Sequence, residues 1–302
     1  MNIHILEMPL DFGASRHGSD MGPSAIRLAG IRERLEALGH QTVRYDAPVQ
    51  INPQEYEEPG NPKAKYLEPI ARACGVLARE VEAAAEAEGF PLVLGGDHSI
   101  ALGSLAGMGA FARRRKKRLG VLYVDAHGDF NTPETTPSGN IHGECLAASC
   151  GYGLDALTNL HYPGAKVSAQ NVCFVGTRDL DPGERALMKA AGVTVFSMSD
   201  IERHGFPAVV KKIVVFFKSH ADIVHVSFDM DVLDPMFAPG TGIPLPAGLT
   251  NREALLLMEE MADTGLVKSA EIVEVNPVLD VQNQTAVLAV SLAARLLGEK
   301  IY

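Results

Sequence analysis

The segment GVLYVDAHGD, from Gly120 to Asp129, decides the fold of this chain. Its first half is a short apolar run rich in valine, which is typical of a strand buried on both faces of a parallel sheet. Its second half places two carboxylates and an imidazole directly after that strand. In open parallel sheets, ligands bind beyond the carboxyl ends of the strands. The segment therefore predicts a parallel sheet with a functional site at one edge.

Short apolar runs and longer helical patterns alternate along the rest of the chain. This alternation indicates βαβ units and a sheet covered by helices on both faces. We predict an α/β fold of three layers, α/β/α, around a central, eight-stranded, mostly parallel sheet. The predicted strands are Asn2–Leu6, Thr42–Tyr45, Pro91–Leu94, Gly120–Val124, Val172–Val175, Val193–Phe196, Ile223–Phe228 and Ala270–Val273. The predicted helices include Ser24–Leu38, Lys65–Glu88, Pro207–Ser219, Asn251–Asp263 and Gln284–Leu297.

The composition is close to the globular average, with 46% hydrophobic and 21% charged residues among 302. We expect a single domain over residues 1–302, because α/β folds often reach this length without dividing. No run approaches the roughly 18 apolar residues of a membrane span, and the first residues show no leader pattern, so a cytoplasmic protein is expected. The net charge of −10 disfavours nucleic acid as a partner and suits a small cationic ligand.

Other features of the sequence have plain structural explanations. The basic run Arg113–Arg118 is expected at the end of a helix, where it complements the helix dipole. Asn52–Lys63 and Thr132–Gly143 are predicted loops, and a loop as long as the second is often functional. The cysteines contain no C-x-x-C pair, which favours a reducing compartment and a packing role. They are Cys74, Cys145, Cys150 and Cys173.

Three strand ends carry acidic and histidine residues: GGDHS at Gly95–Ser99, DAHGD at Asp125–Asp129 and DMD at Asp229–Asp231. On an extended segment, residues two apart project to the same side. The alternate residues of these motifs are therefore expected to converge. Together with His98, they gather four carboxylates and two imidazoles.

Four clustered carboxylates cannot all stay ionised in a partly buried cleft, because burial and like charges both raise their pKa. Two divalent cations would balance them, which predicts a two-metal site. Carboxylate and imidazole ligands favour manganese, with nickel, cobalt, iron or zinc as substitutes. Taken singly, each Asp is also explained as a helix N-cap and each His as an ordinary polar residue. The joint occurrence of the three motifs favours the metal site.

These motifs resemble those of the arginase family of ureohydrolases, and the resemblance covers nearly the whole chain. It implies the arginase-like fold and a hydrolase that acts on linear amidines. The matching segments are DMGPSAIR (Asp20–Arg27), GGDHSIALGS (Gly95–Ser104), VDAHGDFNTPETTPSGNIHG (Val124–Gly143), TRDLDPGER (Thr177–Arg185), SFDMDVLDP (Ser227–Pro235) and EVNP (Glu274–Pro277).

By this resemblance, two Mn²⁺ ions per chain would share the acidic cluster, with a hydroxide between them as the nucleophile. A guanidinium carbon is a poor electrophile, and metal coordination lowers the pKa of water to about 7 in favourable sites. Asp125 and Asp229 would bridge the ions, and Asp129 would also orient the hydroxide. The implied ligands of the first ion are His98, Asp125, Asp129 and Asp229, and those of the second are His127, Asp125, Asp229 and Asp231.

The resemblance also implies residues for catalysis and substrate binding. Glu274 matches the carboxylate that anchors the guanidinium group, whose planar fork suits bidentate pairing. His142 matches the proton shuttle, a role for a group that titrates near neutral pH. Read alone, Glu274 is a strand-end acid and His142 a loop residue. The residues implied for the α-carboxylate are Asn131, Thr136 and Ser138, and those for the α-amino group are Asp181 and, at longer range, Glu184.

The implied reaction is the conversion of L-arginine to L-ornithine and urea, in a homotrimer or homohexamer. An agmatinase, or another guanidino-acid ureohydrolase with the same metals, is the alternative, and agmatine lacks the α-carboxylate that the long loop would receive. A catalytically silent binding subunit is a third reading. The presence of every implied metal ligand, together with Glu274 and His142, disfavours it.

Some residues differ from the usual pattern of the family. By the family's layout they lie near the guanidinium end and the mouth of the pocket, where they bear on substrate choice and turnover rather than on metal chemistry. None of them removes an implied metal ligand. They are Val232 for the usual Gly, Ile243 for Thr, Ala247 for Gly, Asn251 for Tyr, and Glu144-Cys145 where Met or Pro is more familiar.

Overall fold

Eight parallel strands form the centre of the computed structural model, which describes residues 1–46, 49–52 and 56–301. Every pairing between them is parallel, so the predicted fold class is confirmed. Each predicted strand overlaps an observed one. The strands are β1 (Asn2–Met8), β2 (Gln41–Asp46), β5 (Phe90–Gly95), β6 (Leu119–Val124), β7 (Val172–Val175), β8 (Thr194–Phe196), β9 (Ile223–Asp229) and β10 (Val267–Val273).

The order of strands in the sheet is β2-β1-β5-β10-β9-β6-β7-β8, which differs from their order in the chain. The last strand, β10, lies between β5 and β9: Ala270 pairs with Leu92 on one side and with Val226 on the other. The four central strands, β5, β10, β9 and β6, therefore end side by side at the same end of the sheet.

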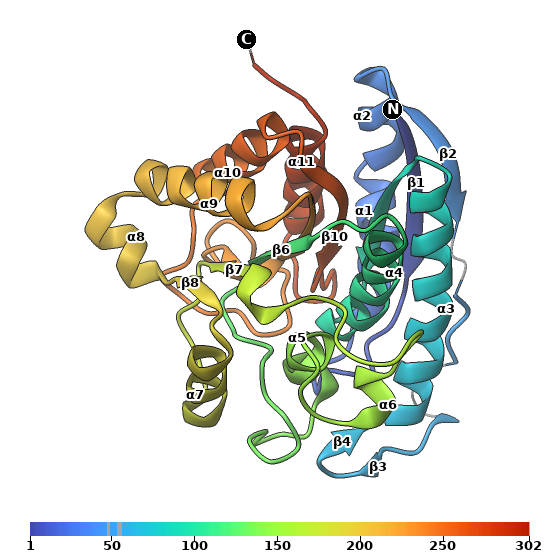
Figure 1. Cartoon of the computed structure of the whole chain (residues 1–302). Helices are drawn as coiled ribbons and strands as arrows, with labels where there is room; N and C mark the ends of the chain where they lie inside the picture. The colour runs from blue at the N-terminus through green and yellow to red at the C-terminus, as the bar shows by residue number, and fades with distance from the viewer. Residues whose placement is uncertain (47–48, 53–55, 302) are drawn as a thin grey trace.

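Helices cover both faces of the sheet and form three layers with it (Figure 1). Each face has its own apolar core, because the strands are buried on both sides and the helices contribute one apolar stripe each. One face is covered by α1 (Gly22–Leu28), α2 (Ile31–Ala37), α8 (Met198–His204), α9 (Phe206–His220), α10 (Asn251–Asp263) and α11 (Gln284–Leu296). The other is covered by α3 (Leu67–Glu86), α4 (Ala101–Arg114), α5 (Cys145–Ser149), α6 (Asp155–Thr158) and α7 (Pro182–Ala191).

Helix boundaries follow local chemistry. The hydroxyl of Thr250 accepts a hydrogen bond from the backbone of Glu253, whose carboxylate accepts one from the backbone of Thr250, so a capping box begins α10 at the predicted residue. The prediction of one helix over Ser24–Leu38 is wrong. Gly30 takes a left-handed conformation with φ of 86°, which divides this segment into α1 and α2.

The remaining expectations concern loops, cysteines and charged runs. In the predicted loop Asn52–Lys63, residues 53–55 lie outside the described residues, and the rest includes β3 (Gly60–Asn61), which pairs with β4 (Ala64–Lys65). All four cysteines are buried and free. The basic run begins in the last turn of α4, as expected. Within the described residues, no helix combines the length and apolar character that crossing a membrane requires.

Candidate metal centre and substrate pocket

The predicted metal ligands lie at the carboxyl ends of three central strands. His98 begins a short 3₁₀ helix after β5, Asp125 follows β6 directly, and Asp229 ends β9. Because these strands are three of the four central strands and run parallel, their carboxyl ends lie at the same end of the sheet, and residues separated by more than a hundred positions come together. The site is thus a product of the strand order, and no single segment contains it.

The convergence was predicted correctly, but the geometry behind it was not. Residues 125–129 do not continue the strand as an extended segment, and Asp129 has a left-handed backbone with φ of 48°. Likewise, Asp231 lies in a 3₁₀ helix, Met230–Val232, rather than in extended chain. The side chains meet because each segment turns at the end of its strand.

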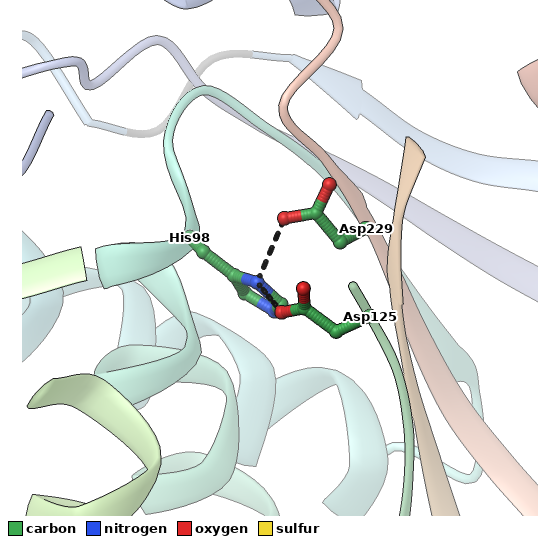
Figure 2. A group of neighbouring side chains, drawn as sticks. All are labelled: His98, Asp125 and Asp229. Atoms are coloured by element: carbon green, nitrogen blue, oxygen red, sulfur yellow. Dashed lines mark hydrogen bonds and ion pairs between the residues drawn. The ribbon is translucent and has the colours of Figure 1, made fainter. Parts of the chain in front are cut away.

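His98 stands at the centre of the first cluster. Its Nδ1 lies 3.1 Å from Oδ2 of Asp125, of Asp129 and of Asp229. Figure 2 shows this ring nitrogen directed between Asp125 and Asp229. Burial lowers the pKa of His98, but its hydrogen bonds to the three carboxylates outweigh burial and raise it well above the usual value. One ring nitrogen carries at most one proton, so it cannot satisfy three carboxylates.

A second cluster shares a residue with the first. His127 Nδ1 lies 3.0 Å from Oδ2 of Asp231 and 3.5 Å from Oδ1 of Asp125. Asp125 thereby belongs to both groups of potential ligands, whereas Asp229 groups with His98. Burial, followed by the charges of Asp231 and Asp125, raises the pKa of Asp229 well above the usual value. The two clusters thus concentrate negative charge that requires compensation.

The donor atoms of these clusters fit divalent cations. Oδ1 of Asp125 accepts a hydrogen bond of 2.7 Å from the backbone of His127, and Oδ1 of Asp229 accepts one of 2.7 Å from the backbone of Asp231. The capping explanation and the ligand explanation therefore apply to different oxygens of the same carboxylates. The other oxygen of Asp125, Oδ2, is buried, and apart from the contact of 3.1 Å with Nδ1 of His98, which two other carboxylates share, it has no hydrogen-bond partner among the described residues. Such an oxygen, within a set of carboxylates and imidazoles, is what a divalent metal occupies.

A buried hydrogen-bond chain fixes the ring of His98 from behind. Ser227 Oγ lies 2.7 Å from His98 Nε2 and donates to Glu271 Oε1 at 2.7 Å. Because Ser227 gives its own proton to Glu271, it accepts one from Nε2, so Nδ1 is the ring nitrogen that could bind a metal ion. No role was predicted from the sequence for Ser227 or Glu271. The available signal was the acidic Glu271 within the predicted strand Ala270–Val273, whose other residues are apolar.

Glu274 and His142 lie together beside the two clusters of carboxylates and histidines. Glu274 directly follows β10, and its Oε1 lies 3.4 Å from His142 Nδ1 and accepts a hydrogen bond of 2.9 Å from the backbone of His98. Burial lowers the pKa of His142, but the hydrogen bond and charge of Glu274 outweigh burial and raise it to about 9. The carboxylate thus holds a proton on the imidazole next to the pocket.

A pocket of about 130 Å³ opens above the clusters. Its walls contain all five residues that the resemblance implies for substrate binding, together with His142 and Glu274. His98 and Asp125 are completely buried and do not line it. These five residues, for which the resemblance implies substrate binding, are Asn131, Thr136, Ser138, Asp181 and Glu184.

The loop at the rim of the pocket presents free hydroxyl protons. Thr136 Oγ1 accepts a hydrogen bond from the backbone of Gly139, and Ser138 Oγ accepts one from the backbone of Asn140, so each hydroxyl keeps its proton for an anion. Gly139 has φ of 71°, and a Cβ there would lie 1.9 Å from the carbonyl oxygen of Pro62. The glycine therefore allows the loop to rest against the chain near β4.

Two acidic residues at the start of α7 also line the pocket: Asp181 is the N-cap of the helix and Glu184 lies in its first turn. Asp181 Oδ2 accepts a hydrogen bond of 2.9 Å from the amide of Asn131. Glu184 accepts hydrogen bonds from the backbone of Phe130 and of Asp181, and burial is the main cause that raises its pKa to about 8. Glu184 therefore orders the loop and the start of α7, while the carboxylate of Asp181 faces the pocket.

The departures from the family pattern lie in different environments. Ile243 lines the pocket, as expected from its predicted place at the mouth. Val232 was also expected there, but it is buried in the apolar core on the α9–α11 face and does not line the pocket. Cys145 contacts the first cluster of carboxylates around His98, where its Sγ lies 3.7 Å from Oδ2 of Asp129.

Known proteins share this architecture over the whole chain. The model of the Arginase family matches residues 1–298. Arginase of Brevibacillus brevis is 47% identical and that of Bacillus caldovelox 45% identical, each over 99% of both chains. The crystal structure of arginase from Bacillus cereus is 46% identical, covers 100% of both chains and superposes with a TM-score of 0.93. With this likeness in sequence and in fold, the chain belongs to the arginase family.

Proposed function

We propose that this hydrolase converts L-arginine to L-ornithine and urea, with two Mn²⁺ ions per chain. The observation that carries the proposal is the position of two carboxylate and histidine clusters, sharing Asp125, beneath a pocket with Glu274 on its wall. The names of the relatives from Brevibacillus brevis and Bacillus caldovelox support the same activity.

The metal ions would be held by the residues of the two clusters. Asp125, which belongs to both clusters, would help to hold both ions, and so would Asp229. When bound, two such cations lower the pKa of water and supply a hydroxide at neutral pH. Carboxylate and imidazole ligands favour manganese, and other divalent metals such as nickel, cobalt, iron or zinc suit the same set. The proposed ligands are His98, Asp125, Asp129 and Asp229 for one ion and His127, Asp125, Asp229 and Asp231 for the other.

Glu274 binds the guanidinium group, and His142 supplies a proton to the leaving amine. Glu274 lines the pocket and offers a carboxylate that can accept two parallel hydrogen bonds from the planar group. His142, whose proton is held by Glu274, donates that proton to the departing amine. The buried chain from His98 to Glu271 keeps the ligand imidazole in one orientation.

The other end of the pocket favours an α-amino acid. The hydroxyl protons of Thr136 and Ser138 and the amide of Asn131 suit the α-carboxylate of arginine, and the carboxylate of Asp181 suits its α-ammonium group. Agmatine carries no carboxylate, so these donors would remain without a partner. This difference favours arginine over agmatine.

Urea release from L-arginine and from agmatine, after loading with Mn²⁺ and after chelation, tests the proposal. We expect arginine to be preferred and both activities to require metal. Preference for agmatine or for another guanidino acid would refute the substrate assignment. Fewer than about one bound metal per chain after loading, with no urea from any guanidino compound, would identify a silent subunit and refute the two-metal reaction.

We further propose that the chain acts as a single domain in the cytoplasm and assembles into a homotrimer or homohexamer. Exposed apolar side chains between β10 and α11 support the assembly, because a surface group of this kind favours contact with another chain. They are Val278, Leu279 and Val281, with Val287 on α11 itself. Light scattering after gel filtration tests the assembly, and a monomeric mass would refute it.

A further inference from the structure

Tyr123 on β6 is completely buried, and its hydroxyl points at the cluster of carboxylates around His98. The hydroxyl donates a hydrogen bond of 2.7 Å to Oδ2 of Asp129. That same oxygen lies 3.1 Å from Nδ1 of His98. A single phenol therefore contacts the carboxylate oxygen through which Asp129 would bind metal.

The ring of Tyr123 contacts the other side of the cluster. It stacks on the imidazole of His98, with ring centroids 4.5 Å apart and an angle of 7° between the planes. Phe174 on β7 packs against it with centroids 4.8 Å apart. A phenylalanine at position 123 would fill this space equally well, so packing alone does not require the hydroxyl. Its buried oxygen is explained by the hydrogen bond to Asp129.

Asp129 is held from its other side by the start of α5. Its carbonyl oxygen accepts hydrogen bonds from the backbone of Leu146 and of Ala147, at 3.1 and 3.2 Å. Cys145, the first residue of that helix, places its thiol 3.4 Å from the hydroxyl of Tyr123 and 3.7 Å from Oδ2 of Asp129. These contacts retain Asp129 in its left-handed backbone conformation and leave Tyr123 to orient the carboxylate.

We propose that Tyr123 is a positioning residue for the metal ion bound by His98 and Asp129, and that Cys145 supports it. The phenol fixes the plane of the Asp129 carboxylate and the ring fixes the plane of the imidazole, so two ligands from different segments meet in one geometry. This inference rests on the proposed two-metal function. Tyr123 does not line the pocket, so it acts on the metal and leaves substrate binding unchanged.

The test is the variant Tyr123→Phe, which removes the hydroxyl and retains the stacked ring. The control is Tyr45→Phe, because the hydroxyl of Tyr45 on β2 has no hydrogen-bond partner among the described residues. Each purified, metal-free protein is titrated with Mn²⁺, and free Mn²⁺ is measured from its electron paramagnetic resonance signal. For Tyr123→Phe, we expect one of the two ions to bind about 10 to 100 times more weakly and the other to bind as in the unaltered protein. For Tyr45→Phe, we expect both affinities to be unchanged.

Further measurements separate positioning from a general loss of structure. The metal-free Tyr123→Phe protein should remain folded and melt only a few degrees below the unaltered protein, because a single buried hydrogen bond is lost. The rise in melting temperature on adding a fixed amount of Mn²⁺ should be smaller in the variant than in the unaltered protein. At saturating Mn²⁺, kcat should fall while KM for arginine stays constant. Equal affinity for both ions in Tyr123→Phe and in the unaltered protein would refute the inference.

Cys145→Ala is a second test variant. It leaves the hydrogen bond from Tyr123 to Asp129 in place, so its loss of Mn²⁺ affinity should be smaller than that of Tyr123→Phe. The double variant should lose less than the product of the two single losses, because both residues act on one oxygen. Independent effects would refute the role of Cys145. If the unaltered protein binds no Mn²⁺, the proposed function itself fails, which is a distinct result.

Discussion

Replacing Glu274 with glutamine tests the link between the pocket and the reaction. The side chain keeps its size, and an amide oxygen can still accept the hydrogen bond from the backbone of His98. What it loses is the negative charge that faces the pocket and the imidazole of His142. Binding of the guanidinium group and the protonation of His142 should both change.

The magnitude follows from the bonds at stake. A hydrogen bond to a charged group contributes about 1.5–3 kcal/mol, and a guanidinium group can make two to one carboxylate. The glutamine retains one neutral acceptor, so a net loss of about 3 kcal/mol is expected, which corresponds to a fall in kcat/KM of roughly a hundredfold. The hydrogen bond and charge of Glu274 also raise the pKa of His142 to about 9. Without that charge the pKa falls, so the alkaline limb of the activity profile should move to lower pH.

Urea release by the variant is measured over about five pH units, from about pH 6 to about pH 11. This profile gives the variant's kcat/KM and the position of its alkaline limb. Asp179→Asn is a matched control, because this exposed carboxylate also lines the pocket but has no role in the proposed mechanism. The control should retain activity within about threefold, a free-energy difference below about 1 kcal/mol. If Glu274→Gln behaved like the control in kcat/KM and in its alkaline limb, the assignment of Glu274 would be wrong.

Three other perturbations have defined outcomes. Asn131→Ala and Ser138→Ala should each raise KM for arginine about tenfold and leave turnover of agmatine unchanged; equal KM values would contradict the carboxylate site. Burial, followed by the charge of Glu134, raises the pKa of Glu144 to about 7 from 4.5, so the folded protein binds that proton more tightly and loses stability as pH rises through this window. Glu144→Gln removes this titration, so the melting temperature of the variant should exceed that of the unaltered protein by an amount that grows from pH 4.5 to 7. A difference that stays constant with pH would show that titration of Glu144 is not its cause. Removing metal from protein saturated at about 100 times Kd should lower the melting temperature by about 5–10 °C, measured by calorimetry, whereas no change would argue against binding to the folded state.

The strands were predictable because a parallel sheet imposes a simple pattern on the sequence. Val172–Val175 was predicted with the observed bounds, and the other predicted strands differ from the observed ones only at their ends. The helix α4 was indicated only by the basic run at its end, because its glycine, alanine and serine residues are buried almost throughout and give little amphipathic contrast. The break at Gly30 depends on a backbone conformation that apolar periodicity does not reveal.

The candidate site was predictable in its residue types and less so in its geometry. Motifs at strand ends and the family resemblance predicted a set of metal ligands, and the structure brings their side chains close together. The turned backbone at Asp129 and the 3₁₀ helix at Asp231 depend on hydrogen bonds from other segments, such as those from α5 to Asp129. Tyr123 and Glu271 read as ordinary strand residues until the fold brings Asp129 and Ser227 against them.

The position of β10 in the sheet has a consequence for synthesis of the chain. β2, β1 and β5 form one group of paired strands, and β9, β6, β7 and β8 form another; among the described strands, β10 alone joins them. This joining strand spans Val267–Val273, so most of the polypeptide must leave the ribosome before the two groups can associate. His98 and Asp229 lie in different groups. We therefore expect metal to bind only after β10 has paired with both groups of strands, so that metal binding indicates completed folding.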